Sequence, residues 1–418
     1  MEPLKRGGLF RRIAPCLVLL ATATLVLGVH SAHADTVAAT VPIGGGYPTL
    51  FAFDSANGDI YVTDYGHNGA GSNVTIISGS TNGVVGGVVV GPGPFGIAFD
   101  PANGELYVAD AGSNSVAVID ASTNEVVGTV AVGTYPNGVT FDAANGEVYV
   151  ANDGTDTVSV INASSNEVVA TVAVGQYPVY SAFDSSNGDV YVANGGSNSV
   201  SVIDGSSNEV VATILVGRTP VYAVFDAANG DVYVLNNVQA TISVIDGSSN
   251  AIVASIPTGT GPVAAAVDPQ NGEIYVAISL NNGKGTVVSV VSGETDAVVG
   301  NVTVGKDPFG VVFDPDDGEV YVANFHSASV SVIAPSQVTS SSSSASSAQS
   351  SSLSAGDSVV LVGVAVAVEV ASLVIGSRRS GARKHGARTL LADRVPAFGR
   401  RARELRLDPR GTPMRPGA

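Results

Sequence analysis

Side chains with an ionisable nitrogen are scarce between positions 35 and 357, so the few that occur there are the first candidates for binding or catalysis. The region has two histidines and three cations against 31 acidic side chains. An aromatic residue lies within two positions of each histidine. Such a set favours an acidic or carboxylated ligand, because cations pair with an anion and aromatic rings supply an apolar platform. The candidate ligand-binding residues are Tyr65, His67, Arg218, Lys284, Lys306, Phe325 and His326.

The same residues predict neither a metal centre nor an enzyme. Zinc needs three or four protein ligands, and this region offers only His67 and His326 as nitrogen ligands. The sequence has no glycine-rich phosphate loop, no nucleophile elbow and no HExxH motif. The excess of acidic side chains disfavours a nucleic-acid partner. We therefore expect no cofactor, no metal ion and no catalytic residue.

A repeated unit must position these side chains. The dipeptide Tyr-Val recurs seven times, with spacings of 42 residues in the middle of the array and 46 at its two ends. One unit reads as four short strands: one ending at Asp142, then 147–150, 158–161 and 168–174. Asn145-Gly146 is expected to supply the positive φ angles of a tight turn between the first two strands. A period in the forties that is rich in short strands is typical of propeller blades.

The two ends of the array predict a closed ring. The last unit stops after its third strand, at 329–334, and lacks a fourth. The segment Val37–Gly44 has no strands before it and matches the fourth strand Val169–Gly175. Pairing the two ends leaves no open edge, whereas a linear solenoid would need capping repeats. The predicted fold is an all-β, seven-bladed β-propeller closed by an N-terminal strand, plus one C-terminal transmembrane helix.

The repeat resembles the YVTN-type β-propeller repeat of archaeal and bacterial surface-layer-like proteins, over about residues 36–335. The matching sequences are Tyr-Val-Ala-Asn or Tyr-Val-Thr-Asp and the Val-Gly-x-x-Pro junctions such as 216–220. The first type occurs at 61–64, 149–152, 191–194 and 321–324. This resemblance implies a propeller with a surface role and supplies no site residues.

The chain ends indicate secretion and membrane anchoring. Basic residues precede an apolar run at 13–29, and Ala32-His33-Ala34 has the small-x-small form of a signal-peptide cleavage site. A second apolar run, 359–376, contains one charge and is followed by basic residues, which stay cytoplasmic. The predicted parts are a signal peptide (1–34), the propeller ectodomain (35–335), a Ser-rich stalk (336–357), a transmembrane helix (358–377) and a basic cytoplasmic tail (378–418).

Blade topology sorts the loops onto two faces. Loops between the second and third strands of a blade, and those that join blades, share one face, which we call the top face. The other turns form the bottom face, from which the stalk departs. The bottom turns are rich in Asp and Glu, which indicates either calcium sites or ordinary Asp-capped turns. The turns are favoured, because Ca²⁺ takes six or more oxygen ligands. All seven candidate residues fall on the top face.

We expect a single-pass cell-membrane protein with an extracellular propeller that acts as a non-catalytic binding, adhesion or surface-layer module. Its expected partners are the membrane and an acidic glycan or a surface protein. Self-association is expected through the small residues Gly363, Ala367 and Ala371, which recur every four positions. The alternative is an extracellular propeller enzyme of the sugar-lactone hydrolase or quinoprotein-like class.

Overall fold

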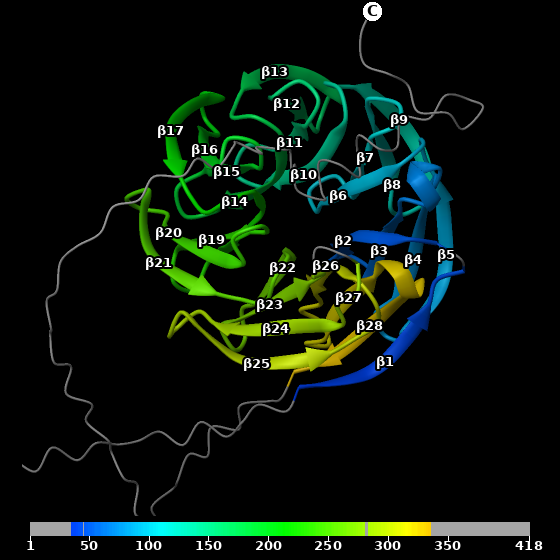
Figure 1. Ribbon diagram of the computed structural model, residues 1–418. Coiled ribbons are helices and arrows are strands. Elements are labelled where there is room, and N and C mark those ends of the chain that lie inside the picture. The colour runs from blue at the N-terminus through cyan, green and yellow to red at the C-terminus, as the bar shows by residue number, and fades with distance from the viewer. Residues whose placement is uncertain (1–34, 45, 281–282, 336–418) are drawn as a thin grey trace, which may run out of the picture.

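A computed structural model describes residues 35–44, 46–280 and 283–335. Seven four-stranded antiparallel sheets, or blades, form a ring, with the first strand of each blade at the centre and the fourth at the rim (Figure 1). The predicted seven-bladed propeller is therefore confirmed. The signal peptide, stalk, transmembrane helix and tail lie outside the described residues. Within the described part, no helix has the length and apolarity needed to cross a membrane.

The strands follow one plan in every blade. Blade 1 comprises β2 (Pro48–Asp54), β3 (Asp59–Asp64), β4 (Asn73–Ser78) and β5 (Gly83–Val89). Blade 2 comprises β6 (Pro94–Asp100), β7 (Glu105–Asp110), β8 (Ser115–Asp120) and β9 (Glu125–Ala131). Blade 3 comprises β10 (Pro136–Asp142), β11 (Glu147–Asn152), β12 (Thr157–Asn162) and β13 (Glu167–Ala173). Blade 4 comprises β14 (Pro178–Asp184), β15 (Asp189–Asn194), β16 (Ser199–Asp204) and β17 (Glu209–Leu215).

The other three blades complete the ring. Blade 5 comprises β18 (Pro220–Asp226), β19 (Asp231–Asn236), β20 (Thr241–Asp246) and β21 (Ala251–Pro257). Blade 6 comprises β22 (Pro262–Asp268), β23 (Glu273–Ile278), β24 (Val287–Ser292) and β25 (Ala297–Thr303). Blade 7 comprises β26 (Pro308–Phe313), β27 (Val320–Asn324), β28 (Ser329–Ala334) and β1 (Thr36–Pro42).

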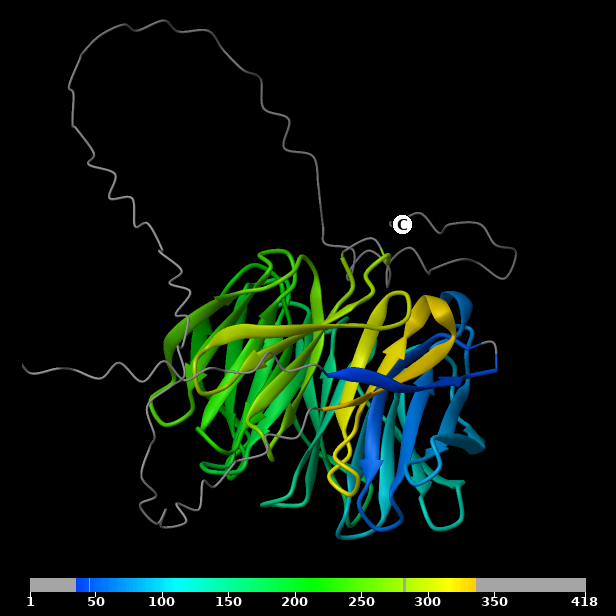
Figure 2. The ribbon, with the colours of Figure 1, turned by 90° about the horizontal axis from the view of Figure 1, so that it is seen from below.

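The two ends of the propeller meet in blade 7, as the repeat count predicted. Strand β1 pairs antiparallel with β28, from Thr36 opposite Ala334 to Pro42 opposite Ser329. In the side view, the blue β1 runs along the outer edge beside the yellow strands of blade 7 (Figure 2). Every strand of the ring, with its core, lies within residues 35–335, so this part of the chain is a self-contained folding unit.

The second strand of each blade forms the core between neighbouring sheets. Its repeat tyrosine is fully buried in all seven blades, and the flanking aliphatic residues are buried as well. The fourth strands behave differently, since their paired valines, such as Val126 and Val127, are exposed at the rim. Burial on both sides of the second strand explains why the sequence there is a continuous apolar run.

The bottom turns correct one part of the sequence interpretation. Gly146 has φ +73°, but Asn145 does not adopt a positive φ. Instead, Asn145 accepts a hydrogen bond from the Glu147 N–H at 2.8 Å and donates to the Gly205 carbonyl of the next blade at 2.9 Å. The amide thus links blades. The buried Asp142 caps the turn by accepting from the Ala144 N–H at 2.8 Å, as Asp does in the other blades.

Each repeat tyrosine also locks its blade to the next one. The phenol donates to the Asn or Asp that directly precedes the fourth strand of the following blade, with O···O distances from 2.6 to 3.5 Å. The pairs are Tyr61–Asn124, Tyr107–Asn166, Tyr149–Asn208, Tyr191–Asn250, Tyr233–Asp296, Tyr275–Asp35 and Tyr321–Asn82. We call these contacts the tyrosine latches. Burial raises the pKa of the phenols; that of Tyr191 rises to about 12, so it remains a neutral donor.

Candidate binding site on the top face

Four predicted site residues meet where blades 7, 1 and 2 join. The loop after β3 carries Tyr65 and a 3₁₀ turn at His67–Gly69, and the loop after β27 forms a 3₁₀ turn at Phe325–Ser327. Blades 1 and 7 are neighbours only because the ring closes. His67 and His326, 259 positions apart in the sequence, therefore flank one side chain, Tyr47, with ring centroids 5.9 and 6.2 Å from it.

A continuous row of aromatic rings extends from this point across the three blades. Tyr47 packs on Phe325, with centroids 4.9 Å apart. Phe325 contacts Phe309 at 6.0 Å, Phe309 contacts Phe95 at 5.7 Å, and Phe95 contacts Tyr65 at 5.8 Å. Most neighbouring rings meet edge to face or tilted, which is the favoured geometry for aromatic pairs. We call these five rings the aromatic row.

His326 is held in place by a buried carboxylate. Its Nδ1 lies 2.7 Å from Oδ2 of Asp307, whose side chain is fully buried, whereas the imidazole is 40% exposed. The other carboxylate oxygen of Asp307 accepts a hydrogen bond from the Ser279 hydroxyl at 2.5 Å. Because Nδ1 is engaged with Asp307, Nε2 is the nitrogen of His326 that remains for a ligand.

The Ser279, Asp307 and His326 side chains do not form a nucleophilic triad. In such a triad the histidine lies between the hydroxyl and the carboxylate, so that it can take the hydroxyl proton. Here the carboxylate lies in the middle, and the serine has no contact with the imidazole that would activate it. The arrangement instead fixes the orientation of the imidazole.

Two of the three predicted cations, Lys284 and Lys306, come from loops whose backbone contacts the residues of the His326 turn. The backbone carbonyl of Lys306 accepts from the His326 N–H at 3.1 Å, and its own N–H donates to Ser327. Lys284 follows Gly283, whose backbone packs against the imidazole so closely that an added Cβ would lie 2.7 Å from Cε1 of His326. Arg218 is not part of this group. It lies between blades 4 and 5, where its backbone N–H donates to the side-chain oxygen of Gln239 at 2.9 Å.

Sequence reasoning missed the residues that connect the site: Tyr47, Phe95, Phe309, Asp307 and Ser279. Asp307 did leave a signal. The residue before each junction proline is Tyr, Gly or Thr in the other six units, and only the seventh unit has a carboxylate there. Asp307 also has φ +58°, a conformation that costs energy for a residue other than glycine. The aromatic row left no such signal, because its members come from loops and strands of three different blades.

The first strands, which lie at the centre of the ring, offer little polar chemistry. Tyr180 and Tyr222 stack at 4.2 Å with an interplanar angle of 12°, and burial raises the pKa of both phenols. Gly138 makes room for this stack, since a Cβ there would meet Tyr180 at 2.6 Å. The first-strand position taken by these tyrosines carries neither a carboxylate nor a histidine in any blade. Across the described residues, no three His, Cys, Asp or Glu side chains are grouped so that they could hold a metal ion.

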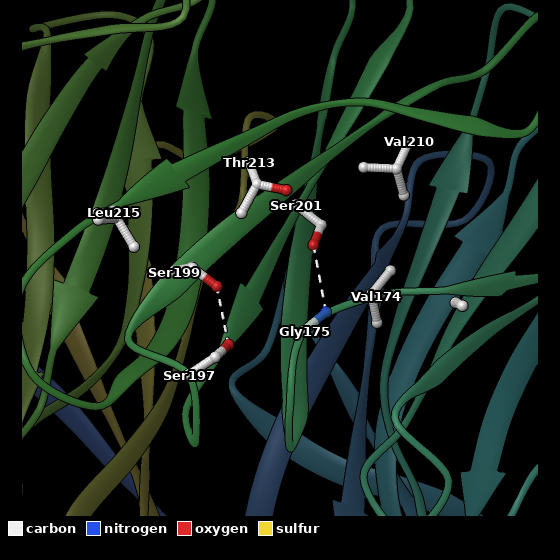
Figure 3. Close-up of a pocket in the computed structure, with 9 residues that line it drawn as sticks. Val174, Gly175, Ser197, Ser199, Ser201, Val210, Thr213 and Leu215 are labelled. Carbon is white, nitrogen blue, oxygen red and sulfur yellow. Dashed lines mark hydrogen bonds between the residues drawn. The ribbon is translucent and has the colours of Figure 1, made fainter.

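A separate groove of about 360 Å³ lies at the rim between blades 3 and 4 (Figure 3). Its hydroxyl groups bond within the protein: Ser197 pairs with Ser199 at 2.8 Å, and Ser201 accepts from the Gly175 N–H at 3.3 Å. None of the predicted site residues lines it, and it has no ionisable side chain. The residues around His326 on the top face are therefore a stronger candidate for the binding site than this groove.

Comparisons with known proteins support the fold alone. No family model matches the chain, and no curated protein matches its sequence. Among solved structures, hydrazine synthase from Kuenenia stuttgartiensis is similar with a TM-score of 0.61. The match has 21% sequence identity and covers 73% of this chain and 98% of the other. At this identity the likeness extends to the propeller architecture and not to activity.

Proposed function

We propose that this chain is a membrane-anchored propeller of the YVTN-repeat type that binds an acidic glycan or an acidic surface protein without catalysis. The observation that carries the proposal is the aromatic row together with His326, which contacts Tyr47 and Phe325 and lies against the buried Asp307. Four of the five rings are half-buried and Phe309 is buried, and this row, with one fixed imidazole beside it and two lysines in the adjoining loops, suits a carboxylated sugar. The ring of such a sugar stacks on aromatic side chains, and the carboxylate of the sugar pairs with cations.

Topology supports a surface role. The ring ends at Ala334, on the bottom face, so a stalk and membrane span that follow it leave the top face directed away from the membrane. The same geometry suits adhesion or membership of a surface layer. The bottom face is strongly acidic, so a second copy's bottom face is one acidic partner that the top face could bind.

Binding of the 35–335 fragment to polygalacturonate, measured by calorimetry at low and high ionic strength, tests the proposal. A neutral polysaccharide serves as the comparison ligand. We expect binding to the acidic polymer alone, weakened by salt because surface charge pairs are screened. Phe325→Ala, or Lys284→Gln with Lys306→Gln, should abolish it. Tyr177→Ala is the matched control, since Tyr177 is an aromatic residue exposed on the top face between blades 3 and 4. Binding that survives both changes would overturn the proposed site.

One observation favours the alternative, an extracellular enzyme. A histidine whose Nδ1 is held by a buried carboxylate has the arrangement of a general base acting through Nε2. Incubating the fragment with the same polymer and following chain length distinguishes the two functions. Cleavage that disappears in His326→Gln would replace the binding proposal with a catalytic one.

A further inference from the structure

Blade 6 departs from the repeat at two positions of its rim strand β25. Asn301 lies opposite Ser289 of β24, and Thr303 lies opposite Val287. The residues that correspond to Asn301 in the other blades are Gly87, Thr129, Thr171, Thr213, Ser255 and Thr40. Those that correspond to Thr303 are Val89, Ala131, Ala173, Leu215, Pro257 and Pro42. No other blade has Asn at the first position or a hydroxyl residue at the second, and the two departures together make the sequence Asn301-Val302-Thr303.

Asn-x-Ser/Thr without proline in the middle is the acceptor sequence for N-linked glycans in exported proteins. It occurs three times, at 73–75, 162–164 and 301–303. In the first two cases the hydroxyl residue belongs to the repeat, since most other blades also have Ser or Thr at the place of Thr75 and at that of Ser164. Only the sequence in β25 requires two departures from the repeat, and both supply what the acceptor sequence needs.

The rim strand presents the Asn301 amide to solvent in a fixed orientation. Asn301 and Thr303 are both exposed, whereas Val302 between them is buried, as the alternation of an extended strand requires. The Oδ1 atom of Asn301 accepts a hydrogen bond from the Ser289 hydroxyl at 2.9 Å. Among residues 35–44, 46–280 and 283–335, none accepts a hydrogen bond from its Nδ2 atom, which is the atom that carries an N-linked glycan. The oxygen therefore anchors the amide while the nitrogen remains available.

Asn73 shows the opposite arrangement. Its Nδ2 atom donates to the hydroxyl of Thr75 at 3.2 Å, and Thr75 is buried. A Cβ at Gly87 would lie 3.3 Å from this nitrogen, so the backbone of the neighbouring strand β5 covers it. A sugar on Asn73 would have to displace both contacts, whereas a sugar on Asn301 would displace none.

We propose that the rim of blade 6 carries an N-linked oligosaccharide on Asn301, an inference that rests on the proposed export of the propeller. The donor is an oligosaccharide joined to a lipid through phosphate. The Nδ2 atom attacks C1 of the first sugar. The N–C1 bond forms, the C1–O bond to phosphate breaks, the phosphate leaves with the bonding electron pair, and Nδ2 gives up one proton to solvent.

A glycan at this place suits the rest of the fold. Val298 and Val299 of the same strand are 37% and 46% exposed, and the outer edge of β25 is the open edge of its sheet. A bulky hydrated oligosaccharide on this strand covers part of the apolar edge and hinders its pairing with another chain. Because Asn301 lies in a rim strand and the residues around His326 lie in top-face loops, the glycan leaves the proposed binding site open.

The first experiment reads the modification itself. The full-length chain is expressed in a eukaryotic cell line, recovered from the cell surface, and analysed by peptide mass spectrometry before and after enzymatic removal of N-linked glycans. We expect a glycan on Asn301 and an unmodified Asn73. Thr303→Val should remove the glycan, and the matched control Thr303→Ser should keep it.

A chain at the cell surface without a glycan on Asn301, or with one on Asn73, overturns the assignment. A chain retained in the cytoplasm contradicts the proposed export and the glycan with it. Binding of the 35–335 fragment to polygalacturonate is a separate measurement, which Asn301→Gln should leave unchanged, so failure of the proposed binding function is distinguishable from failure of this inference.

The second experiment tests the geometry without a host enzyme. The single cysteine of the sequence is Cys16, so the 35–335 fragment has none and a new thiol can be labelled selectively. Asn301→Cys and, as the matched control, Asn73→Cys are treated with a maleimide-linked oligosaccharide under native conditions. We expect rapid labelling of Asn301→Cys with no change in its thermal midpoint, and labelling of Asn73→Cys that is several-fold slower. Equal labelling rates, or a lower midpoint for the Asn301→Cys conjugate, would show that the rim does not favour a glycan at this position.

Discussion

Asp110 is a buried carboxylate whose replacement by Asn should stabilise the propeller in a strongly pH-dependent way. It ends β7 and is 1% exposed. Its Oδ2 accepts from the Gly91 N–H at 3.0 Å, but its Oδ1 has no hydrogen-bond donor. Desolvation is the main cause that raises its pKa from 3.8 to about 7, and the Gly91 hydrogen bond opposes this shift. Four other blades have Asn at this position, as Asn152 in blade 3.

The sign of the effect follows from proton linkage. In the unfolded chain Asp110 loses its proton near pH 4, whereas in the folded protein it keeps the proton until about pH 7. Folding therefore becomes less favourable as pH rises between these values, and the loss is complete above them. A shift of about three pKa units corresponds to about 4 kcal/mol at pH 8 and less than about 1 kcal/mol at pH 4.

Asp110→Asn removes this loss while an amide oxygen still accepts from Gly91. In blade 3 the Nδ2 group of Asn152 donates to the Thr157 hydroxyl. Ser115 occupies the corresponding place in blade 2, so the new Nδ2 group at position 110 would meet Ser115. Thermal unfolding of the 35–335 fragment should shift upward by about 8 °C at pH 8, at about 2 °C per kcal/mol for a domain of this size, and barely at pH 4. The reverse change, Asn152→Asp, should lower the midpoint at pH 8. Equal shifts at the two pH values, or destabilisation at pH 8, would refute the reasoning.

Three further predictions follow from the ring, the latches and the site. Deleting residues 35–42 exposes the edge of β28, so calorimetry should show loss of the cooperative transition or chromatography should show aggregates; an unchanged melting curve contradicts the closure. Tyr191→Phe removes the bonds to Asn250 at 2.8 Å and Gly247 at 3.1 Å and should cost about 1–2 kcal/mol in urea unfolding; no change in midpoint would show that the latch is energetically silent. Asp307→Asn should weaken polygalacturonate binding several-fold while circular dichroism remains that of the parent, because the imidazole loses its anionic partner; unaltered binding would remove His326 from the site.

The sequence by itself determined the repeat architecture. Seven Tyr-Val dipeptides at regular spacing, together with the missing fourth strand at 335 and its match at 37–44, were sufficient to predict seven blades and their closure. Local chemistry fixes these features, since each blade needs a buried second strand and an Asp-capped turn. The prediction erred where a side chain contacts the neighbouring blade: Asn145 uses its amide to bridge to Gly205 rather than to adopt a positive φ.

Only the tertiary structure decided which residues share a site. His67 and His326 were recognisable as unusual residues, but their common neighbour Tyr47 becomes visible only once the ring is closed. In the sequence, Phe95 and Phe309 have no feature that distinguishes them from other first-strand residues. Arg218 was predicted as a site residue, although it lies two blades away from the others. The physical reason is that a propeller builds its top face from loops of different blades. Contacts there depend on the angle between sheets, which no local pattern in the sequence records.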